Sequence, residues 1–463
     1  MQLSLLHQST AKRREMILRG PITPTLLLLS VPTIMMGIVQ SAIPVIDGLY
    51  INNFSGTVAA SAVTYCGPIV MMMSALAQGL SVAGMAIIGQ MNGKGEISAA
   101  KHVATQIVVS TFLIGLLMMP FLAILSFPIS RHVTPSISHD VFLYLSLNSL
   151  VLPFSFLEFV YNAIKNSNGK PEAPFIRMVL MLGLKLLFNA IFIAVIPLGI
   201  VGTVISSLLA NMLICVWMYF EMFVLKGDDK LELRGFRFDF EVICELFKIG
   251  VPSMLSSVML NLGFFLINNE VEKYGPVTLN GQGIANNITS ICFIVPSSFG
   301  SSVTTMVSMN VGAEQGNKAR RSCIAGCIVS AISAVLLIAL VVPLSPHITV
   351  LFTRNPDVLH IANKALHIYT YSVVGFGICM VQLGAFIGLG RTSIPLVIGV
   401  LRIWLLRYMF ILATEQFLGV YSVFWGNLFS NYMCAVITTV LFLKIHWVSV
   451  IKTDTKDKAA AAV

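Results

Sequence analysis

The stretch VPTIMMGIVQSAIPVIDGLYI at residues 31–51 decides the fold, because a second apolar stretch opens with the same Val-Pro pair at residues 251–252, about 220 residues later. The first copy leads through Gly93-Lys94 to Ala100-Lys101, and the second leads through Gly312-Ala313 to Ala319-Arg320. A repeat of this length in an apolar chain predicts two bundles of about six helices each. A site between two such bundles can open to one side of a membrane and then to the other, so the sequence indicates transport.

The composition is that of a membrane protein. Of the 463 residues, 56% are hydrophobic and only 11% are charged, whereas soluble domains carry about 25% charged residues. Apolar runs long enough to span a bilayer recur along the chain, and the short alternating strands of a β-barrel do not. We predict an all-α polytopic membrane protein with about twelve transmembrane helices in two pseudo-symmetric six-helix lobes. The predicted helices lie near residues 24–51, 58–89, 103–127, 140–164, 175–197, 199–225, 243–269, 278–310, 321–344, 359–389, 394–418 and 420–445.

Basic residues gather in alternate connections between these helices. The clusters are Lys12/Arg13/Arg14/Arg19, Lys94/Lys101/His102, Lys165/Lys170/Arg177, Lys226 to Lys248, Lys318/Arg320/Arg321 and Lys444/Lys452. The positive-inside rule then places both termini in the cytoplasm, and it accounts for most of the net charge of +9. Short loops and the lack of a cleavable signal peptide predict a multi-pass protein of the bacterial inner (cytoplasmic) membrane. The predicted domains are a cytoplasmic segment at 1–20, a first lobe at 21–225, a connector at 226–242, a second lobe at 243–445 and a cytoplasmic tail at 446–463.

Several classes of function lack their sequence features. The eight cysteines show neither zinc-ligand nor disulfide spacing and fall mostly within predicted helices. No His-Glu metal motif, phosphate loop or Ser/His/Asp set stands out, so we expect neither an enzyme nor a bound cofactor or metal. Basic residues are not interleaved with stacking aromatics, which argues against nucleic acid. The expected partners are small organic substrates and membrane lipids, and we expect a monomer.

Polar residues within the predicted first helix carry much of the functional prediction, since each costs free energy unless it is paired or faces water. Gln40, Asp47 and Tyr50 share one face of this helix. Pro32 and Pro44 interrupt it, and we predict hinges at both. A simpler alternative is that Asp47 only ends the helix near the outer interface.

Three further helices of the first lobe carry polar residues at helical spacing. These are Tyr144, Asn148, Ser155, Glu158 and Asn162 in the fourth helix, Lys185 and Asn189 in the fifth, and Ser207 and Asn211 in the sixth. Residues that only join helices would not need to align over several turns. The alignment predicts a water-accessible cavity in this lobe, with Gln40, Tyr50, Tyr144, Asn148, Asn162, Ser207 and Asn211 as candidates for binding substrate.

The predicted cavity holds two carboxylates and one ammonium group, those of Asp47, Glu158 and Lys185. A low-dielectric pocket favours a protonated carboxyl group, and a nearby ammonium favours the carboxylate. Two acids that share one lysine can therefore gain or lose a proton at little cost. With Asn189, we expect these residues to couple transport to H⁺, with Na⁺ as the second choice. The alternative is a static Glu158–Lys185 ion pair that holds the helices together.

The second lobe is polar in a different way. Its candidates are Asn261, Asn268 and Glu272 on one face of the seventh helix, Gln382 in the tenth and Arg402 in the eleventh. We expect Arg402 and Arg407, both in the eleventh helix, to reach the membrane surface or to pair with an acid of the same lobe.

Several segments resemble the MATE family, the multidrug and toxic compound extrusion transporters. They are Gln40…Asp47-Gly-Leu-Tyr-Ile, Gly89-Gln-Met-Asn-Gly-Lys-Gly, Gly281-Gln-Gly-Ile-Ala-Asn-Asn-Ile, Met309-Asn-Val-Gly-Ala-Glu-Gln-Gly-Asn and Gly388-Leu-Gly-Arg-Thr-Ser-Ile-Pro. The resemblance implies two six-helix lobes that form a V around a central cleft. It also implies export of cationic or amphipathic compounds, driven by Na⁺ or H⁺. The family's first-helix acid and glutamine fall on Asp47 and Gln40, and its fourth-helix tyrosine and asparagine on Tyr144 and Asn162.

The chain departs from that family pattern at two positions. Lys185 and Asn189 stand where many prokaryotic members have Asn and then Asp, and Glu158 stands at a position that those members give to Asn. An ammonium 4 Å from a bound Na⁺ would repel it by about 4 kcal/mol at an effective dielectric of 20. This favours H⁺ coupling, with Asp47 and Glu158 sharing Lys185, although a Na⁺ site in the second lobe stays possible.

Two alternatives to cation export stay open. Lys185 can attract an anionic or zwitterionic metabolite, which would make the protein a dedicated exporter. A lipid-linked oligosaccharide or lipid flippase of the same superfamily is the other. The mixed signs of charge in the first lobe and the helix count speak against the flippase.

Overall fold

The computed structural model describes residues 9–133, 135–225, 230–233, 235–350 and 355–448. A few side chains inside helices, among them those of Asn268 and Glu272, also lie outside the described part. Every regular element within these ranges is a helix. Eleven helices are long and apolar enough to cross a membrane, or twelve if two helices joined by a bend of 43° form one span. The predicted class, an all-α polytopic membrane protein, is confirmed.

The first half of the chain forms eight α-helices and three shorter segments. They are α1 (Thr10–Arg19), α2 (Ile22–Phe54), α3 (Gly56–Lys94), α4 (Ile97–Arg131), α5 (Pro135–Asn148), η1 (Ser149–Val151), α6 (Leu152–Ser167), α7 (Glu172–Asn189), η2 (Ala190–Val195), α8 (Gly199–Tyr219) and η3 (Phe220–Val224). The η1 segment is a 3₁₀ turn inside one kinked span, Ile137–Ser167, whereas η2 and η3 are π-helical ends of α7 and α8.

The second half also consists of helices. Its elements are α9 (Phe240–Glu272), α10 (Pro276–Gly312), α11 (Gly316–Val350), α12 (Pro356–Tyr371), α13 (Val373–Gly388), α14 (Ser393–Val400), η4 (Leu401–Tyr408), α15 (Met409–Leu418) and α16 (Tyr421–Lys444). The predicted tenth helix is the bent pair α12 and α13. The π-helical segment η4 lies in the middle of the next span, between α14 and α15.

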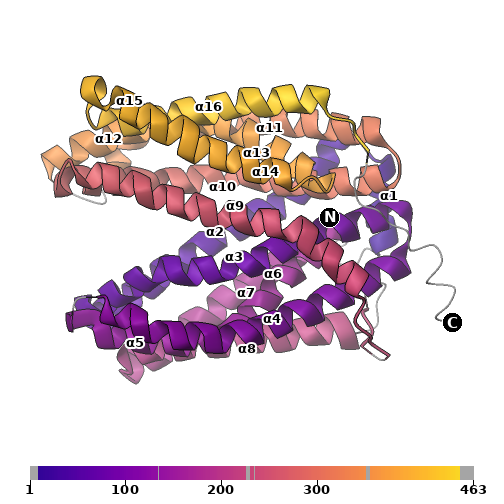
Figure 1. Ribbon diagram of the computed structural model, residues 1–463, viewed down its shortest axis with the longest axis horizontal. Coiled ribbons are helices and arrows are strands. Elements are labelled where there is room, and N and C mark those ends of the chain that lie inside the picture. Colours follow the sequence, from indigo (N-terminus) through magenta and orange to yellow (C-terminus); the bar gives the residue numbers. More distant parts are fainter. Residues whose placement is uncertain (1–8, 134, 226–229, 234, 351–354, 449–463) are drawn as a thin grey trace.

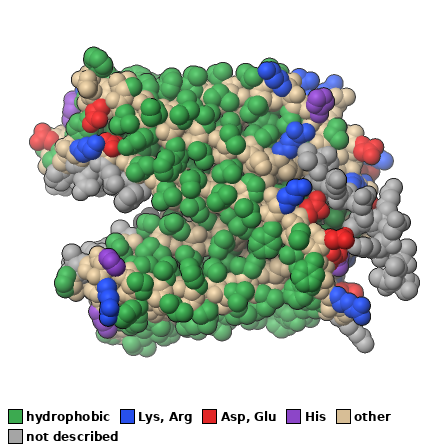
Figure 2. Space-filling view, in the orientation of Figure 1, with side chains coloured by type: hydrophobic (Ala, Val, Ile, Leu, Met, Phe, Trp, Pro, Cys, Tyr) green, Lys and Arg blue, Asp and Glu red, His purple; other side chains and the backbone are tan. Residues whose placement is uncertain are grey.

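The elements form two bundles, with α2 to α8 in one lobe and α9 to α16 in the other (Figure 1). The molecule is hollowed between the lobes at one end, which we call the open end (Figure 2). At the other, the closed end, α1 lies beside the junction of the lobes, and Ile445–Trp447 lie beside Gly20–Ile22. The two lobes therefore diverge from a common base.

Glycines allow the two lobes to meet tightly at the closed end. A Cβ atom on Gly93 of α3 would lie 2.0 Å from the carbonyl oxygen of Met309 in α10. A Cβ atom on Gly312 of α10 would lie 2.0 Å from the carbonyl oxygen of Gln90 in α3. The Gln90 amide also donates to the Gly388 carbonyl over 2.8 Å. Backbone thus packs directly on backbone at this crossing, as only glycine permits.

The first helix of each lobe begins in the core of the other lobe. Leu26 and Leu29 of α2 pack with Phe299 of α10 and with helices α11, α13 and α16. Leu246 and Ile249 of α9 pack in the core that α3, α4, α6 and α8 build. These two helices tie the lobes together, so any movement of one lobe relative to the other has to move or bend α2 and α9. The residue boundaries predicted for the lobes stay a prediction.

The α1 helix contacts both lobes at the closed end. Arg13 is buried and forms an ion pair with Glu172 of α7, while Arg14 donates to the Gly93 carbonyl of α3 over 2.9 Å. From the second lobe, the Lys318 ammonium donates to the Leu18 carbonyl over 2.7 Å. Burial lowers the pKa of the Arg13 guanidinium, and the neighbouring carboxylate offsets part of that shift. The segment predicted as a cytoplasmic N-terminus therefore includes a docked helix.

Candidate functional site

Asp47 of α2 and Lys185 of α7 form an ion pair inside the first lobe, with 2.8 Å between Oδ2 and Nζ. The Asn189 amide donates to the other carboxylate oxygen over 2.7 Å. The Lys185 ammonium also donates to the Ser207 hydroxyl of α8 over 2.6 Å. The Lys185 side chain is 4% exposed and that of Asp47 is 20% exposed. Three helices thus bring together four of the residues singled out in the sequence, which we call the Asp47 cluster: Asp47, Lys185, Asn189 and Ser207.

The sequence of α7 explains how two of these residues reach the interior. Arg177, Met181, Lys185 and Asn189 recur every fourth residue, and all are buried. Residues at this spacing share one face of a helix. The outer face of α7 carries exposed apolar side chains such as Leu187. The α-helix ends at Asn189, where the π-helical η2 begins, a feature that is frequent at functional sites.

Polar residues of α8 and α5 surround the cluster. On α8, the Asn211 amide donates to the Ser207 carbonyl over 2.8 Å, so this side chain is satisfied within its own helix. On α5, Tyr144 is hydrogen-bonded to Asn148 and lies within electrostatic range of Asp47. Asn148 is buried. Tyr144 therefore lies in the same part of the lobe as Asp47, and a cavity with Tyr144 and Asn148 in its lining stays a prediction.

Three substrate candidates make no contact with the Asp47 cluster among the described interactions. Gln40 is exposed on α2. Tyr50 stacks on Phe54, with 6.0 Å between the ring centroids. Asn162 of α6 is partly buried, and its side-chain oxygen has no hydrogen-bond partner. A role for these residues in binding substrate stays a prediction.

Glu158 does not share Lys185, so that prediction is wrong. Its carboxylate pairs with Arg177, with 2.5 Å between Oε2 and Nη1. Arg177 and Lys185 stand eight residues apart on α7, which separates them by about 12 Å along the helix axis. Glu158 of α6 lies level with Arg177, whereas Asp47 of α2 lies level with Lys185. Each carboxylate therefore has its own cation, and the static Glu158–Lys185 pair is wrong as well.

Two residues predicted in a basic connection lie inside the lobe instead. The Arg177 side chain is 1% exposed. Lys165 of α6 is also buried, and its ammonium lies 2.7 Å from the carboxylate of Glu221 at the end of α8. The Tyr161 hydroxyl donates to the same carboxylate over 2.5 Å. Arg177 stands two four-residue steps before Lys185 and so shares its helix face. This spacing was the signal in the sequence that could have placed Arg177 in the interior. Glu221 had no comparable signal.

Among the described residues, three charge pairs join helices of the first lobe at successive depths. Lys165–Glu221 lies nearest the closed end, Glu158–Arg177 comes next, and Asp47–Lys185 lies furthest from that end. Each pair joins an acid and a base on different elements, so the pairs hold α2, α6, α7 and α8 to one another. Asp47 differs in that both of its carboxylate oxygens have a partner: Lys185 contacts one, and Asn189 donates to the other.

The second-lobe candidates whose side chains are described bond to separate partners. The Asn261 amide donates to the Ser257 carbonyl in its own helix over 2.9 Å, and the Ser257 hydroxyl donates to Gln78 of α3, in the other lobe, over 2.9 Å. The Gln382 amide donates to the Thr439 hydroxyl over 2.9 Å. The side chains of Asn268 and Glu272 lie outside the described residues.

Arg402 is buried within the second lobe and does not reach the membrane surface. Its Nη1 atom lies 3.5 Å from the side-chain oxygen of Asn431. No acid pairs with it among the described side chains, contrary to one of the two expectations for this residue. Pro32 and Pro44 both lie within α2, which continues through them as one helix; their role as hinges stays a prediction.

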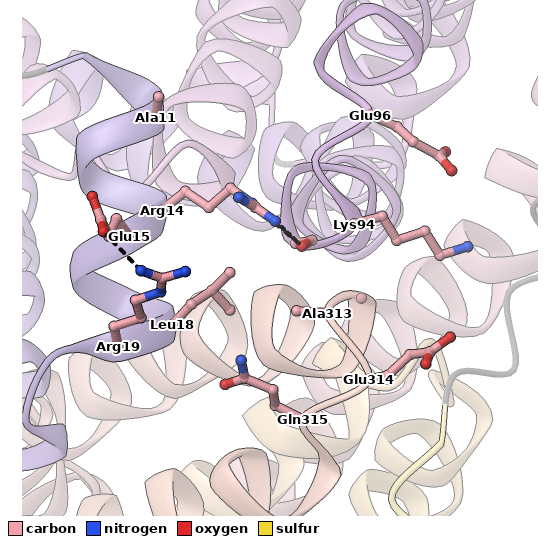
Figure 3. Close-up of a pocket in the computed structure, with 12 residues that line it drawn as sticks. Ala11, Arg14, Glu15, Leu18, Arg19, Lys94, Glu96, Ala313, Glu314 and Gln315 are labelled. Carbon is pink, nitrogen blue, oxygen red and sulfur yellow. Dashed lines mark hydrogen bonds and ion pairs between the residues drawn. The ribbon is translucent and has the colours of Figure 1, made fainter.

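A polar cavity of about 810 Å³ lies at the closed end, outside the lobe interiors. It is lined by α1 and by the ends of α3 and α10, and its charged lining residues are Arg14, Arg19, Lys94, Glu15, Glu96 and Glu314 (Figure 3). The glycine crossing at Gly93 and Gly312 forms one wall. Its charges are balanced in sign, and the glycine crossing separates it from the Asp47 cluster. It is therefore distinct from the candidate site.

Comparisons with known proteins agree with this architecture. The MatE family model matches residues 32–191 and 252–412, one stretch in each lobe. The chain is 24% identical over 388 residues to "Probable multidrug resistance protein YoeA" of Bacillus subtilis (strain 168), which covers 81% of this chain and 83% of that protein. It is 21% identical over 431 residues to "Multidrug export protein MepA" of Staphylococcus aureus (strain MSSA476), which covers 90% of this chain and 93% of that protein.

Solved structures share the fold. A crystal structure of MATE in complex with MaL6 superposes with a TM-score of 0.88 at 20% identity, covering 92% of this chain and 97% of that chain. The outward-facing conformation of a multidrug resistance MATE family transporter gives a TM-score of 0.85 at 20% identity, covering 92% and 96%. The family model matches both halves of the repeat, and the folds agree over nearly the whole chain. The chain therefore belongs to the MATE family of multidrug efflux transporters, which are membrane transporters and not enzymes.

Proposed function

We propose that this protein is a secondary active antiporter that exports cationic or amphipathic organic compounds in exchange for H⁺ by alternating access. The observation that carries this proposal is the Asp47 cluster. A carboxylate within a membrane lobe, balanced by the Lys185 ammonium 2.8 Å away, is a group whose protonation changes the net charge of the Asp47 cluster from zero to plus one.

That change of charge physically links the entry of a proton to the export of the organic cation. With Asp47 ionised, the cluster is neutral, and an organic cation enters the first lobe without electrostatic opposition. When Asp47 gains a proton, the Lys185 charge is no longer balanced, and it repels a bound cation, by about 4 kcal/mol at 4 Å and an effective dielectric of 20. Lys185 stays in place through Ser207. Protons that enter from outside therefore favour release of the cation to the outside.

The same geometry supports H⁺ over Na⁺ at this position. Na⁺ needs several converging oxygen ligands, whereas the two Asp47 oxygens already accept from Lys185 and Asn189. The ammonium lies where a cation bound to that carboxylate would sit. Because Asp47 neutralises the Lys185 ammonium, this ammonium attracts an anionic substrate only weakly.

We further propose that the closed end faces the cytoplasm of a bacterial cell and that the structure is outward-facing. The Lys and Arg side chains of the visible face gather chiefly toward the closed end (Figure 2). Lys94 ends α3 at this end, whereas Lys101 lies near the start of α4 and Lys318 and Arg320 near the start of α11, as the positive-inside rule requires of a cytoplasmic face.

Transport into proteoliposomes with imposed ion gradients tests the proposal. A fluorescent organic cation is followed while a proton gradient or a sodium gradient is imposed separately. We expect the proton gradient alone to drive transport, and Asp47→Asn to abolish that response. Glu415→Gln, at the open end of the other lobe, is the matched control that keeps it. Full proton-driven transport by Asp47→Asn, or transport driven only by sodium, would overturn the proposal.

A further inference from the structure

Two arginines lie in the middle of a membrane span in the second lobe. The span Ser393–Leu418 contains the π-helical segment η4, which carries both Arg402 and Arg407. Arg402 is 8% exposed and Arg407 is 6% exposed. Neither forms an ion pair within the described part of the chain, in contrast to the buried cations of the first lobe, each of which has its own acid.

The side chains of Arg407, Tyr369 and Gln282 converge around the Tyr369 hydroxyl, and each of the three carries a hydrogen-bond donor. The Tyr369 hydroxyl of α12 faces both the Arg407 guanidinium and the Gln282 amide of α10, and Arg407 lies 6.0 Å from the centre of the Tyr369 ring. All three side chains are at least nine-tenths buried. Arg407 Nε, the Tyr369 oxygen and Gln282 Nε2 are all shielded from solvent, and none of them has a hydrogen bond of good geometry with the described protein atoms.

The described acids of this lobe that lie nearest are already engaged with other groups. Glu270 pairs with Lys273, and the Tyr408 hydroxyl donates to it over 3.3 Å. Glu415 accepts from the Tyr274 hydroxyl over 3.0 Å. Tyr408 thus turns toward α9, whereas Arg407, the preceding residue, turns toward Tyr369 of α12. No described carboxylate lies on the Arg407 side.

The surroundings of Arg402 are polar but neutral. Its guanidinium lies 5.3 Å from the centre of the Phe376 ring and 3.5 Å from the Asn431 side-chain oxygen. The Asn431 amide in turn donates to Ser372 and to Asn427. These contacts orient Arg402 without cancelling its charge. The interior of the second lobe therefore carries two positive charges and a set of donors.

We propose that the second lobe binds a small monovalent anion among Arg407, Tyr369 and Gln282, with Arg402 supplying the second positive charge. An unpaired cation in a low-dielectric interior is costly, and unpaired buried donors add to that cost. An anion that accepts from a guanidinium, a hydroxyl and an amide removes both penalties at once. The deep burial of the donors restricts the ligand to a halide ion or to a single carboxylate group.

This inference does not rest on H⁺ coupling at Asp47, because it uses a different lobe and a different charge. Two sources of the anion share its chemistry, namely free chloride and the carboxylate of a transported compound. With either anion bound, each lobe would contain a buried cation that is balanced by a negative charge. One lobe would hold a positive charge balanced by Asp47, and the other two positive charges of which a bound anion balances one.

Thermal unfolding of the purified full-length protein in detergent tests the site. Potassium chloride, potassium bromide or potassium acetate is added to a potassium sulfate background at constant ionic strength. We expect the melting temperature to rise and to saturate with chloride and bromide if a free halide is bound, or with acetate if the site takes a carboxylate. Either result supports an anion site, whereas no saturable response to any of the three anions would overturn it.

Substitutions locate the response. In Arg407→Gln and Tyr369→Phe we expect the half-saturating anion concentration to rise about tenfold or more, as for loss of a hydrogen bond to a charged group. Arg321→Gln changes an exposed arginine at the closed end and should keep the wild-type response. If Arg407→Gln does not fold, Tyr369→Phe and Gln282→Leu remain informative. An unchanged half-saturating concentration in these variants would overturn the assignment.

Discussion

Lys185 of α7 donates to the carboxylate of Asp47 in α2 over 2.8 Å, while Asn189, one turn further along α7, donates to the other oxygen of the same carboxylate. Asp47 therefore holds α2 against α7 through both of its oxygens. A proton on Asp47 would remove the ion pair and leave Lys185 bound to Ser207 of α8. The contact between these two helices thus depends on the charge of one side chain.

Lys185→Met should destabilise the protein more than the double substitution Asp47→Asn/Lys185→Met. Removal of one partner leaves a buried charge unpaired, which costs about 3 kcal/mol or more, whereas the double variant leaves two neutral groups. Denaturant unfolding in detergent micelles measures both. Equal loss in the single and double variants would show that the pair carries no coupling energy.

Arg177→Met should lower the free energy of unfolding by about 3–5 kcal/mol, because it leaves the Glu158 carboxylate unpaired inside the lobe. Proton-driven transport by the protein that remains folded should persist, since Asp47 keeps Lys185. Arg321→Met, at an exposed position, is the matched control for stability. If Arg177→Met abolishes proton coupling in folded protein, the two ion pairs do not act separately.

Gly93→Ala should prevent the closed end from closing. The added methyl group would lie 2.0 Å from the backbone oxygen of Met309, and backbone cannot move aside as a side chain can. We expect transport to be lost and hydrogen exchange to rise at residues 86–94 and 305–312. Gly183→Ala, whose methyl group would meet nothing within 4 Å, should leave both unchanged. Unaltered exchange in Gly93→Ala would contradict the role of this crossing.

Lys318→Met should release α1 from the closed end. The ammonium donates to the carbonyls of Leu18 and Gly20, over 2.7 and 3.0 Å, at the end of a helix where carbonyls lack partners. Loss of about 1 kcal/mol corresponds to roughly fivefold faster opening. The rate of limited trypsin digestion at Lys12 to Arg14 measures how often α1 opens, and Arg321→Met is the control. Equal cleavage rates in both variants would show that this contact does not hold α1.

Alkaline pH should weaken the open end of the second lobe. Burial and the hydrogen bond to Glu415 raise the pKa of Tyr274 to about 12, so above pH 10 the unfolded chain loses this proton first and stability falls. The hydrogen bond to Glu270 raises the pKa of Lys273 above 10.5. Its contribution is complete below pH 10.5 and is lost as the pH rises through the raised pKa.

Thermal unfolding between pH 9 and 12 measures this loss. Tyr274→Phe should reduce the fall in melting temperature across that interval, because the variant has no phenol to ionise. Tyr219→Phe, whose ring lies against Phe223, is the matched control and should show the wild-type fall. An identical pH profile in Tyr274→Phe would contradict the prediction.

The polar faces of single helices could be predicted from the sequence. Lys185 and Asn189, and likewise Ser207 and Asn211, follow the helical period. The structure places Lys185, Asn189 and Ser207 in the Asp47 cluster, and Asn211 donates to the Ser207 carbonyl. The partner of each charge could not be predicted. Glu158 pairs with Arg177 because α6 and α7 pack at a particular relative height, and no local spacing encodes that height.

The sequence by itself determined the membrane class, the repeat and the helix faces, because hydropathy and periodicity are local properties of the chain. Tertiary structure alone decided three other features: the first halves of α2 and α9 pack in opposite lobes, Gly93 and Gly312 close one end, and the donors of Gln282, Tyr369 and Arg407 converge. Each of these joins residues far apart in the chain. Their geometry follows from the depth and rotation at which whole helices pack, and those depend on the sum of many contacts.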